Sequence, residues 1–181
     1  MRVLSLAGFT GMENLIRANL HYLSQAESLL ERMDDGCFAA PAPGFYNSSV
    51  GGHLRHCIEH YQAFLAGMED GKVDYDCRAR DERLEQRTGE AVDRVRGIKA
   101  AMERLAANGV PASLLVKMDC GVEEIEWQSS TIGRELQFLV SHTVHHYAMI
   151  GGICRDLGVE MEADFGVAPS TVRHRAAMQP A

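Results

Sequence analysis

Apolar residues recur at intervals of three and four along four long stretches of the chain, and this spacing predicts four amphipathic helices. The predicted helices run from about residue 10 to Met33, from about Asn47 to Met68, from about Asp81 to Ala107, and from Ser130 to Leu157. The third stretch alternates its apolar and small residues most regularly, at spacings of four and three. That pattern is typical of a helix in a left-handed bundle.

Residues that favour helix ends flank these stretches. Residues 47–49 (Asn-Ser-Ser) and 129–131 (Ser-Ser-Thr) can cap the second and fourth helices, because their side chains accept hydrogen bonds from free backbone N–H groups. Residues 34–36 (Asp-Asp-Gly) and Gly158 follow the first and fourth helices, where a glycine readily ends a helix.

The segments between the helices differ in character. Residues 36–46 contain Pro and Gly and form a loop too long for a tight helical hairpin, so we expect this loop and residues 158–181 to line the mouth of a site. Residues 69–80 are charged, and we interpret them as a surface connection. Residues 113–128 alternate apolar and polar positions, which predicts a short β-hairpin.

These elements predict an all-α fold: a four-helix up-and-down type bundle with a short extended or hairpin insertion before the last helix. The 181 residues fit a single domain, 1–181, in which the bundle covers about residues 10–157 and residues 158–181 form a tail. We interpret the tail as a packed arm in which Pro169 can start one last helical turn.

The net charge of −7, from 18 basic and 25 acidic residues, argues against binding to nucleic acid or to an anionic membrane surface. No apolar run in the sequence approaches the length of a membrane span. The five cysteines are dispersed without a CxxC pair, as in proteins of a reducing compartment. The N-terminal sequence also lacks the long apolar core of a secretory signal, so we expect a cytoplasmic protein. From the charge and the absence of a spanning run, we expect no nucleic-acid or membrane partner.

Six of the eight histidines fall into two rows on the predicted helices: His53, His56 and His60 on the second, and His142, His145 and His146 on the fourth. Residues three and four apart project from one face of a helix, so His142 and His146 lie within reach of one ion, and His145 could replace one of them. Two such rows beside the apolar stripes of two helices predict a metal site. The alternative is a set of half-buried structural histidines.

The two segments that carry these histidines, GGHLRHCIEHY and SHTVHHY, resemble the DinB-like superfamily. The resemblance covers about residues 10–157 and implies a four-helix bundle that binds a divalent metal through three histidines. It implies that the metal ligands are His56, His142 and His146. Glu59 matches the acidic residue that the family usually has three positions after the first ligand.

Three neutral imidazoles leave the other coordination positions of a Zn²⁺ or Ni²⁺ ion open to water or to substrate. Glu59 is a catalytic candidate one turn from His56: it could orient a ligand imidazole or act as a base, and the sequence leaves both open. The HTVHH stretch has no Glu directly after its first His, which argues against an HExxH peptidase. Tyr147 departs from the family pattern, since many relatives have Arg there.

The resemblance also implies a type of chemistry. Several DinB-like branches resemble thiol-dependent S-transferases, in which the metal activates a low-molecular-weight thiol against an electrophile. We therefore expect a metal-dependent enzyme that activates a small thiol or water, with a small-molecule thiol and an electrophile as partners, and a homodimer. The alternatives are a metal-dependent hydrolase and a non-catalytic protein that binds metal or a small ligand. We interpret Cys57 as a core residue and not as a catalytic thiol.

Overall fold

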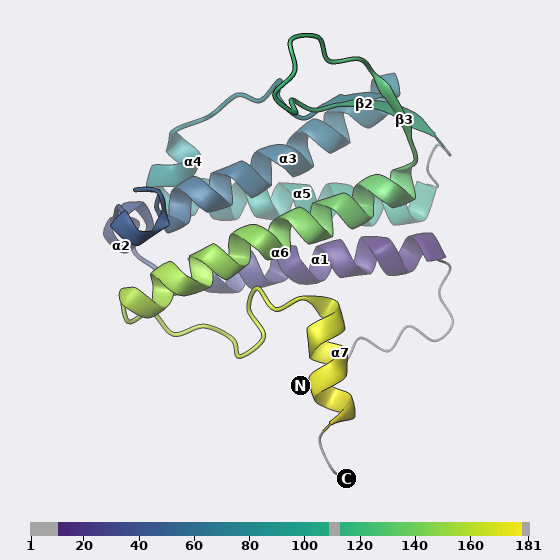
Figure 1. Ribbon diagram of the computed structural model, residues 1–181. Coiled ribbons are helices and arrows are strands. Elements are labelled where there is room, and N and C mark those ends of the chain that lie inside the picture. The colour runs from purple at the N-terminus through teal and green to yellow at the C-terminus, as the bar shows by residue number, and fades with distance from the viewer. Residues whose placement is uncertain (1–10, 109–112, 179–181) are drawn as a thin grey trace.

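The computed structural model describes residues 11–108 and 113–178 of the chain. The protein is mostly helical, and its four long helices lie alongside one another (Figure 1). These helices are α1 (Gly11–Leu30), α3 (Val50–Asp70), α5 (Thr88–Asn108) and α6 (Ile132–Asp156). Helix α1 packs against α5 and α6, and α3 packs against α6 and α5, so the apolar faces of all four meet in one core.

Shorter elements complete the fold. They are the helices α2 (Asp35–Ala39), α4 (Arg83–Gln86) and α7 (Pro169–Ala177), the 3₁₀ turn η1 (Pro43–Phe45), and the strands β1 (Lys72–Asp74), β2 (Leu114–Lys117) and β3 (Gln128–Ser130). Within the described part of the chain, none of the helices has both the length and the apolar character that a membrane crossing requires.

The predicted caps hold both helices that carry the histidine rows. The Ser49 hydroxyl accepts the Gly52 N–H at 2.9 Å and starts α3, and the Thr131 hydroxyl accepts the Arg134 N–H at 3.1 Å and starts α6. Each bond satisfies a backbone donor that has no partner within the helix. Gly158 has φ +71°, the left-handed conformation expected just after a helix.

The third predicted helix is interrupted, so the prediction of one continuous helix over 81–107 is wrong. Arg87 has extended backbone angles and separates α4 from α5. The Asp35 carboxylate accepts both the backbone N–H and the hydroxyl of Thr88 at 2.8 Å, which provides the first turn of α5 with a cap from a distant part of the chain. Such a cap leaves no signal in the local helical periodicity.

The predicted hairpin forms, with β2 antiparallel to β3, although its second strand begins only at Gln128, where the predicted stretch 113–128 ends. A third strand, β1, runs parallel to β2 and pairs Val73 with Val116. The prediction that 69–80 is only a surface connection is therefore wrong. Val73 and Tyr75 are both buried, and β1 fixes the start of the segment that leads to α4.

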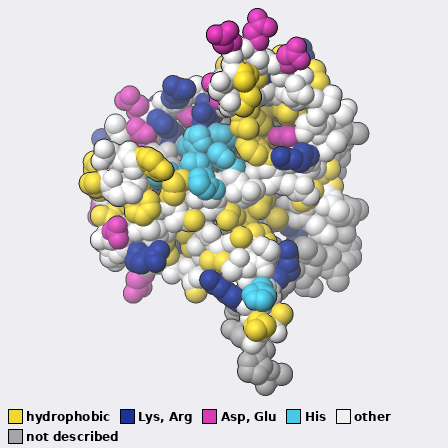
Figure 2. All heavy atoms as spheres, in the orientation of Figure 1, with side chains coloured by type: hydrophobic (Ala, Val, Ile, Leu, Met, Phe, Trp, Pro, Cys, Tyr) yellow, Lys and Arg dark blue, Asp and Glu magenta, His cyan; other side chains and the backbone are white. Residues whose placement is uncertain are grey.

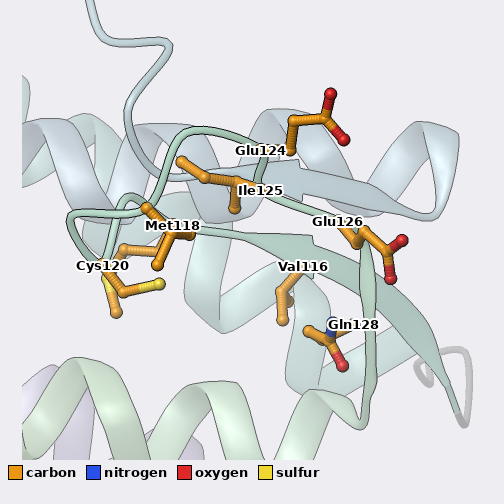
Figure 3. A pocket seen from close by; sticks show the side chains of 8 residues that line it. Val116, Met118, Cys120, Glu124, Ile125, Glu126 and Gln128 are labelled. Carbon is orange, nitrogen blue, oxygen red and sulfur yellow. The ribbon is translucent and has the colours of Figure 1, made fainter.

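The long loop of the hairpin encloses a hollow of about 450 Å³. Figure 3 shows Met118, Cys120 and Ile125 around this hollow, while the carboxylates of Glu124 and Glu126 point to its outside. Next to the loop lies Trp127, whose exposed ring has the ammonium groups of Lys72 and Lys117 at 5.6 and 5.5 Å from its centre. These contacts join β1, β2 and the end of the hairpin loop at the surface of the sheet.

A buried polar network ties three of the long helices together. The Tyr61 hydroxyl donates to Asn19 Oδ1 at 2.8 Å, and Asn19 Nδ2 donates to the Leu136 carbonyl at 3.1 Å. The Thr143 hydroxyl donates to the Tyr61 oxygen at 3.4 Å. Because buried polar groups are costly when left unpaired, this network fixes how α3 and α6 lie against α1.

The tail packs on α1 and α6, as predicted for an arm. The Phe165 ring stacks on Tyr147 with centroids 4.7 Å apart, and the Tyr22 hydroxyl donates to the Val167 carbonyl at 3.2 Å. Gly166 lies so close to the α6 backbone that a Cβ there would be 2.6 Å from the carbonyl carbon of Tyr147. In the segment 36–46, the Phe45 ring packs against Gly152, near the C-terminal end of α6. Residues 179–181 lie outside the described part of the tail.

Gly51 allows α3 and α4 to approach each other, and its replacement tests this contact. A Cβ at Gly51 would be 2.1 Å from the Glu85 carbonyl oxygen, so Gly51→Ala should lower the free energy of unfolding by about 1–3 kcal/mol. Gly97→Ala is the matched control, since no atom lies within 4 Å of its added Cβ. It should raise the free energy of unfolding by about 0.5–1 kcal/mol, because Gly is a poor helix former. Urea unfolding measures both, and equal effects would contradict the close contact.

Candidate metal centre

Five histidines from α3 and α6 meet on one side of the helix pair. The histidine cluster consists of His53, His56 and His60 on α3 and of His142 and His146 on α6. Figure 2 shows histidine side chains gathered in one patch at the surface, with basic side chains at its edge. The cluster is therefore packed between two helices and still reachable from solvent.

The rings of the cluster are in direct contact with one another. The ring centroid of His56 lies 4.9 Å from that of His142 and 4.5 Å from that of His146. His60 lies 4.2 Å from His142 by the same measure, and His53 lies 5.4 Å from His146. Each helix presents histidines one turn apart, and the packing of α3 against α6 places the two rows face to face.

Hydrogen bonds orient several of these rings. His60 Nδ1 lies 2.8 Å from the His56 carbonyl oxygen. Because a carbonyl oxygen only accepts, His60 donates its Nδ1–H there and its Nε2 keeps a lone pair when the ring is neutral. His53 Nδ1 lies 3.2 Å from His146 Nδ1, so one of these two rings donates to the other. Metal-binding histidines in proteins commonly donate their second N–H to such a partner.

The nitrogen atoms of the cluster fit a divalent metal. Nitrogen atoms of His56, His60 and His142 all lie within 4.8 Å of one another. His142 Nε2 and His53 Nε2 are buried and have no hydrogen-bond partner among the described residues. A buried nitrogen without a partner is costly, and a bound cation would satisfy it. Neutral imidazoles are ligands for Zn²⁺ and Ni²⁺ rather than for Mg²⁺ or Ca²⁺.

Electrostatics keep the cluster neutral at physiological pH. Burial, together with the neighbouring His60 and His146 rings and the Arg78 guanidinium, lowers the pKa of His56 to about 2. Burial also lowers the pKa of His146 to about 3 and that of His142 to about 4. Each ring therefore keeps a lone pair that a metal can use without first displacing a proton.

The structure brings His56, His142 and His146 together, and it adds His60 to them. The closest set of ligand atoms contains His60 in place of His146, although the His146 ring is in contact with both His56 and His142. His145 is exposed and its ring touches only the outer side of the cluster, at His146. His56 and His142 are thus common to both possible sets of three ligands.

Glu59 is buried, and its Oε1 accepts the backbone N–H of Asp81 at 2.8 Å. This bond holds the segment before α4 against α3, so Glu59 positions backbone that borders the cluster. The role of Glu59 as a base or as a partner of a ligand imidazole stays a prediction.

Residues 75–78 form the wall of the site, and sequence analysis missed them. Arg78 Nη1 lies 2.6 Å from His56 Nδ1. The Tyr75 ring stacks on His60 with centroids 5.5 Å apart, and Phe138 lies 5.4 Å from His142. One signal in the sequence was available: Val73 and Tyr75 alternate with charged residues, which indicates a strand. In the structure this strand ends beside the site.

Comparison with known proteins agrees with this geometry. The DinB superfamily model matches residues 21–150, which include both histidine rows. The chain belongs to the DinB superfamily. Metal binding is typical of this superfamily, and three histidines of the cluster are close enough to share one ion.

Two further similarities are more limited. The crystal structure of a DinB-like protein from Bacillus cereus matches 83% of this chain and 95% of its own, with a TM-score of 0.59 and 14% sequence identity, which shows a shared fold. The FK506-binding protein 5 of Rhizopus delemar is 32% identical over 105 residues. That match covers 56% of this chain, and the chain spans only 27% of the fungal protein's length.

The lowered histidine pKa values predict an acid-sensitive metal-free protein. The pKa of these histidines is about 6.5 in the unfolded chain and well below that in the fold, so below pH 6.5 the unfolded chain binds protons that the folded protein does not. The free energy of unfolding should therefore fall with pH from about 6.5 downward. Melting temperatures of chelator-treated protein between about pH 7.5 and about pH 5 measure this loss.

Two variants test where that acid sensitivity comes from. His142→Ala should flatten the fall in melting temperature, because it removes one of the histidines that resist protonation in the fold. His145→Ala should flatten this fall less, because His145 is exposed and contributes less than burial does to the lowered pKa of His142. A melting temperature independent of pH over this range would contradict the desolvation of the cluster.

Proposed function

We propose that this protein is a metal-dependent enzyme that activates a low-molecular-weight thiol for transfer to an electrophile. The observation that supports this most directly is a set of contacting, neutral imidazoles that remains reachable from solvent. A structural site is usually closed by its four protein ligands, whereas a catalytic site keeps a position open. The proposal assumes the predicted scaffold, a four-helix up-and-down bundle.

A divalent ion bound by the cluster supplies Lewis acidity, which lowers the pKa of a thiol or a water that reaches it. The imidazoles would hold the ion, and Tyr75 and Phe138 form an aromatic wall beside His60 and His142 that would limit the access of water. Cys57 is buried in the core, and burial raises the pKa of its thiol. The reacting thiol in this proposal therefore comes from a small molecule and not from Cys57.

The proposed ligands are His56, His142 and His146, which the family resemblance implies. A second set, with His60 in place of His146, is favoured by the short distances among its ligand atoms. The two sets share His56 and His142. The third ligand is either His146, one turn after His142 on α6, or His60, one turn after His56 on α3. Zn²⁺ and Ni²⁺ are the proposed metals, because both accept three neutral imidazoles and leave positions open.

Alanine variants of the four histidines separate these two sets. Replacing His56 or His142 should lower zinc affinity by more than the roughly 10–100-fold that the loss of an outer hydrogen-bond partner costs. His146→Ala should do the same if it is the third ligand, while His60→Ala then leaves most of the zinc bound. Zinc affinity is measured by competition with a coloured chelator, and unfolding curves of each variant confirm that it folds.

The opposite result, with zinc lost in His60→Ala and kept in His146→Ala, would replace the proposed ligand set by the second one. His145→Ala serves as the control, since its ring is exposed and contacts the cluster at its outer side, at His146. Zinc binding that survives all four alanine variants would overturn the metal site itself.

A thiol-transfer assay tests the reaction. With 1-chloro-2,4-dinitrobenzene as electrophile, the thiol sulfur forms a bond to the ring carbon while chloride leaves and the thiol proton is released. Metal-loaded wild type should accelerate this reaction with at least one member of a panel of glutathione, cysteine and coenzyme A. His142→Ala should show only the rate of the metal-free protein, because it removes a ligand common to both sets. Absorbance of the thioether product measures the rate.

The alternatives give other outcomes in the same protein samples. A metal-dependent hydrolase would cleave p-nitrophenyl esters or amides and show no dependence on added thiol. A non-catalytic binding protein would take up zinc and show a melting temperature raised by metal, but no turnover with either class of substrate. The absence of a thiol-dependent rate above the metal-free control would overturn the transferase proposal.

A further inference from the structure

Arg78 brings a positive charge to the edge of the histidine cluster. Its Nη1 lies 2.6 Å from His56 Nδ1 and 3.5 Å from His60 Nδ1. Its Nε is buried and has no hydrogen-bond partner in the described part of the chain. Arg78 is therefore partly removed from water, and its guanidinium keeps unused donor capacity beside the site.

The charge of Arg78 has no acidic ion-pair partner in the part of the chain that the structure describes. The ion pairs among the described residues do not include Arg78. Glu59, next to His60 on α3, accepts the Asp81 N–H, and Asp76, two residues before Arg78, accepts the Asp119 N–H. The histidines themselves are neutral. A partly buried, unpaired cation is costly, so an incoming anion would be favoured at this place.

The backbone that carries Arg78 is fixed on both sides. The Tyr75 N–H donates to the Lys117 carbonyl at 3.0 Å, and the Tyr75 hydroxyl donates to Glu135 at 2.8 Å. On the other side, Asp81 is held by Glu59 at 2.8 Å. Arg78 can therefore change its contacts by rotating its side chain, without a rearrangement of the segment between β1 and α4.

Arg78 and a metal ion compete for His56. A guanidinium only donates, so its contact makes His56 Nδ1 the acceptor and puts the ring proton on Nε2. A metal ion needs a lone pair on one of these two nitrogens. Binding through Nδ1 displaces Arg78 directly, and binding through Nε2 moves the proton to Nδ1, where it faces the Arg78 donor. In both cases Arg78 has to leave His56 when the ion binds, and its positive charge also opposes the ion.

We propose that Arg78 is an anion-binding residue beside the metal site, which takes the carboxylate of a small substrate. The planar guanidinium matches a carboxylate in two parallel hydrogen bonds, and the carboxylate neutralises the charge that otherwise opposes the metal. Tyr75 stacks on His60, which Arg78 also approaches, and Phe138 packs on Tyr75, so these rings suit a flat, apolar group attached to that carboxylate. This inference rests on the proposed function, because it places an anionic substrate next to the metal of that site.

The proposal predicts that metal and carboxylate strengthen each other's binding through Arg78. Benzoate is the probe, and benzamide, which has the same shape without the charge, is the matched ligand control. In wild type, benzoate should tighten zinc binding by about fivefold or more, a typical coupling between two sites, and benzamide should not. Competition with a coloured chelator, with and without benzoate, measures the zinc affinity.

Three variants isolate the contribution of Arg78. Arg78→Ala should bind zinc more tightly than wild type in the absence of benzoate, because a competing cation is removed, and it should lose the gain from benzoate. Arg78→Gln keeps most of the side chain without the charge and should behave in the same way, which provides a second variant if alanine destabilises the segment. Arg80→Ala removes an equal charge from an exposed neighbour in the same segment and should behave as wild type.

The outcomes separate this inference from the proposed function. If wild type and the Arg78 variants gain equally from benzoate, the carboxylate binds the zinc directly and the role of Arg78 is overturned. The inference is also overturned if benzoate changes nothing in wild type, or if a phosphate ester such as phenyl phosphate gives the gain and benzoate does not. Wild type that binds no zinc under any condition overturns the proposed function, and this inference with it.

Discussion

The contact between α3 and α6 determines the chemistry of this protein. It takes imidazoles such as His56, His142 and His146 out of water and presses them against one another, so that a proton on any ring is opposed both by burial and by its neighbours. Neutral rings with free lone pairs follow from this packing. The hydrogen bonds of Tyr61 with Asn19 and Thr143 hold the two helices at the distance that makes the contact possible.

The helical framework and the histidine rows could be predicted from the sequence because both depend on local periodicity. The spacing of three and four that marks a helix also determines which histidines share a face, so the meeting of His56 with His142 follows once the two faces are packed together. The caps at Ser49 and Thr131 are equally local, since each bonds a backbone N–H three residues further along the chain. These predictions needed no knowledge of how distant segments meet.

The rest of the site depends on contacts between residues far apart in the sequence. Arg78 reaches His56 because Tyr75 is tied to Glu135 and Asp81 to Glu59, across separations that periodicity does not report. The break before α5 has the same kind of cause, since Asp35 caps a helix that begins more than 50 residues later. His60 could be seen in its row, but its closeness to His142 depends on the angle at which the two helices pack.

The sheet places an optical probe near this site. Trp127 is the only tryptophan of the chain, and its emission is sensitive to the two ammonium groups above its ring. One of them belongs to Lys72 in β1, the strand that continues directly into Tyr75 and the wall of the histidine cluster. A displacement of that wall that moves Lys72 would change the surroundings of this single indole. Emission from Trp127 would then follow the position of β1 without an added label.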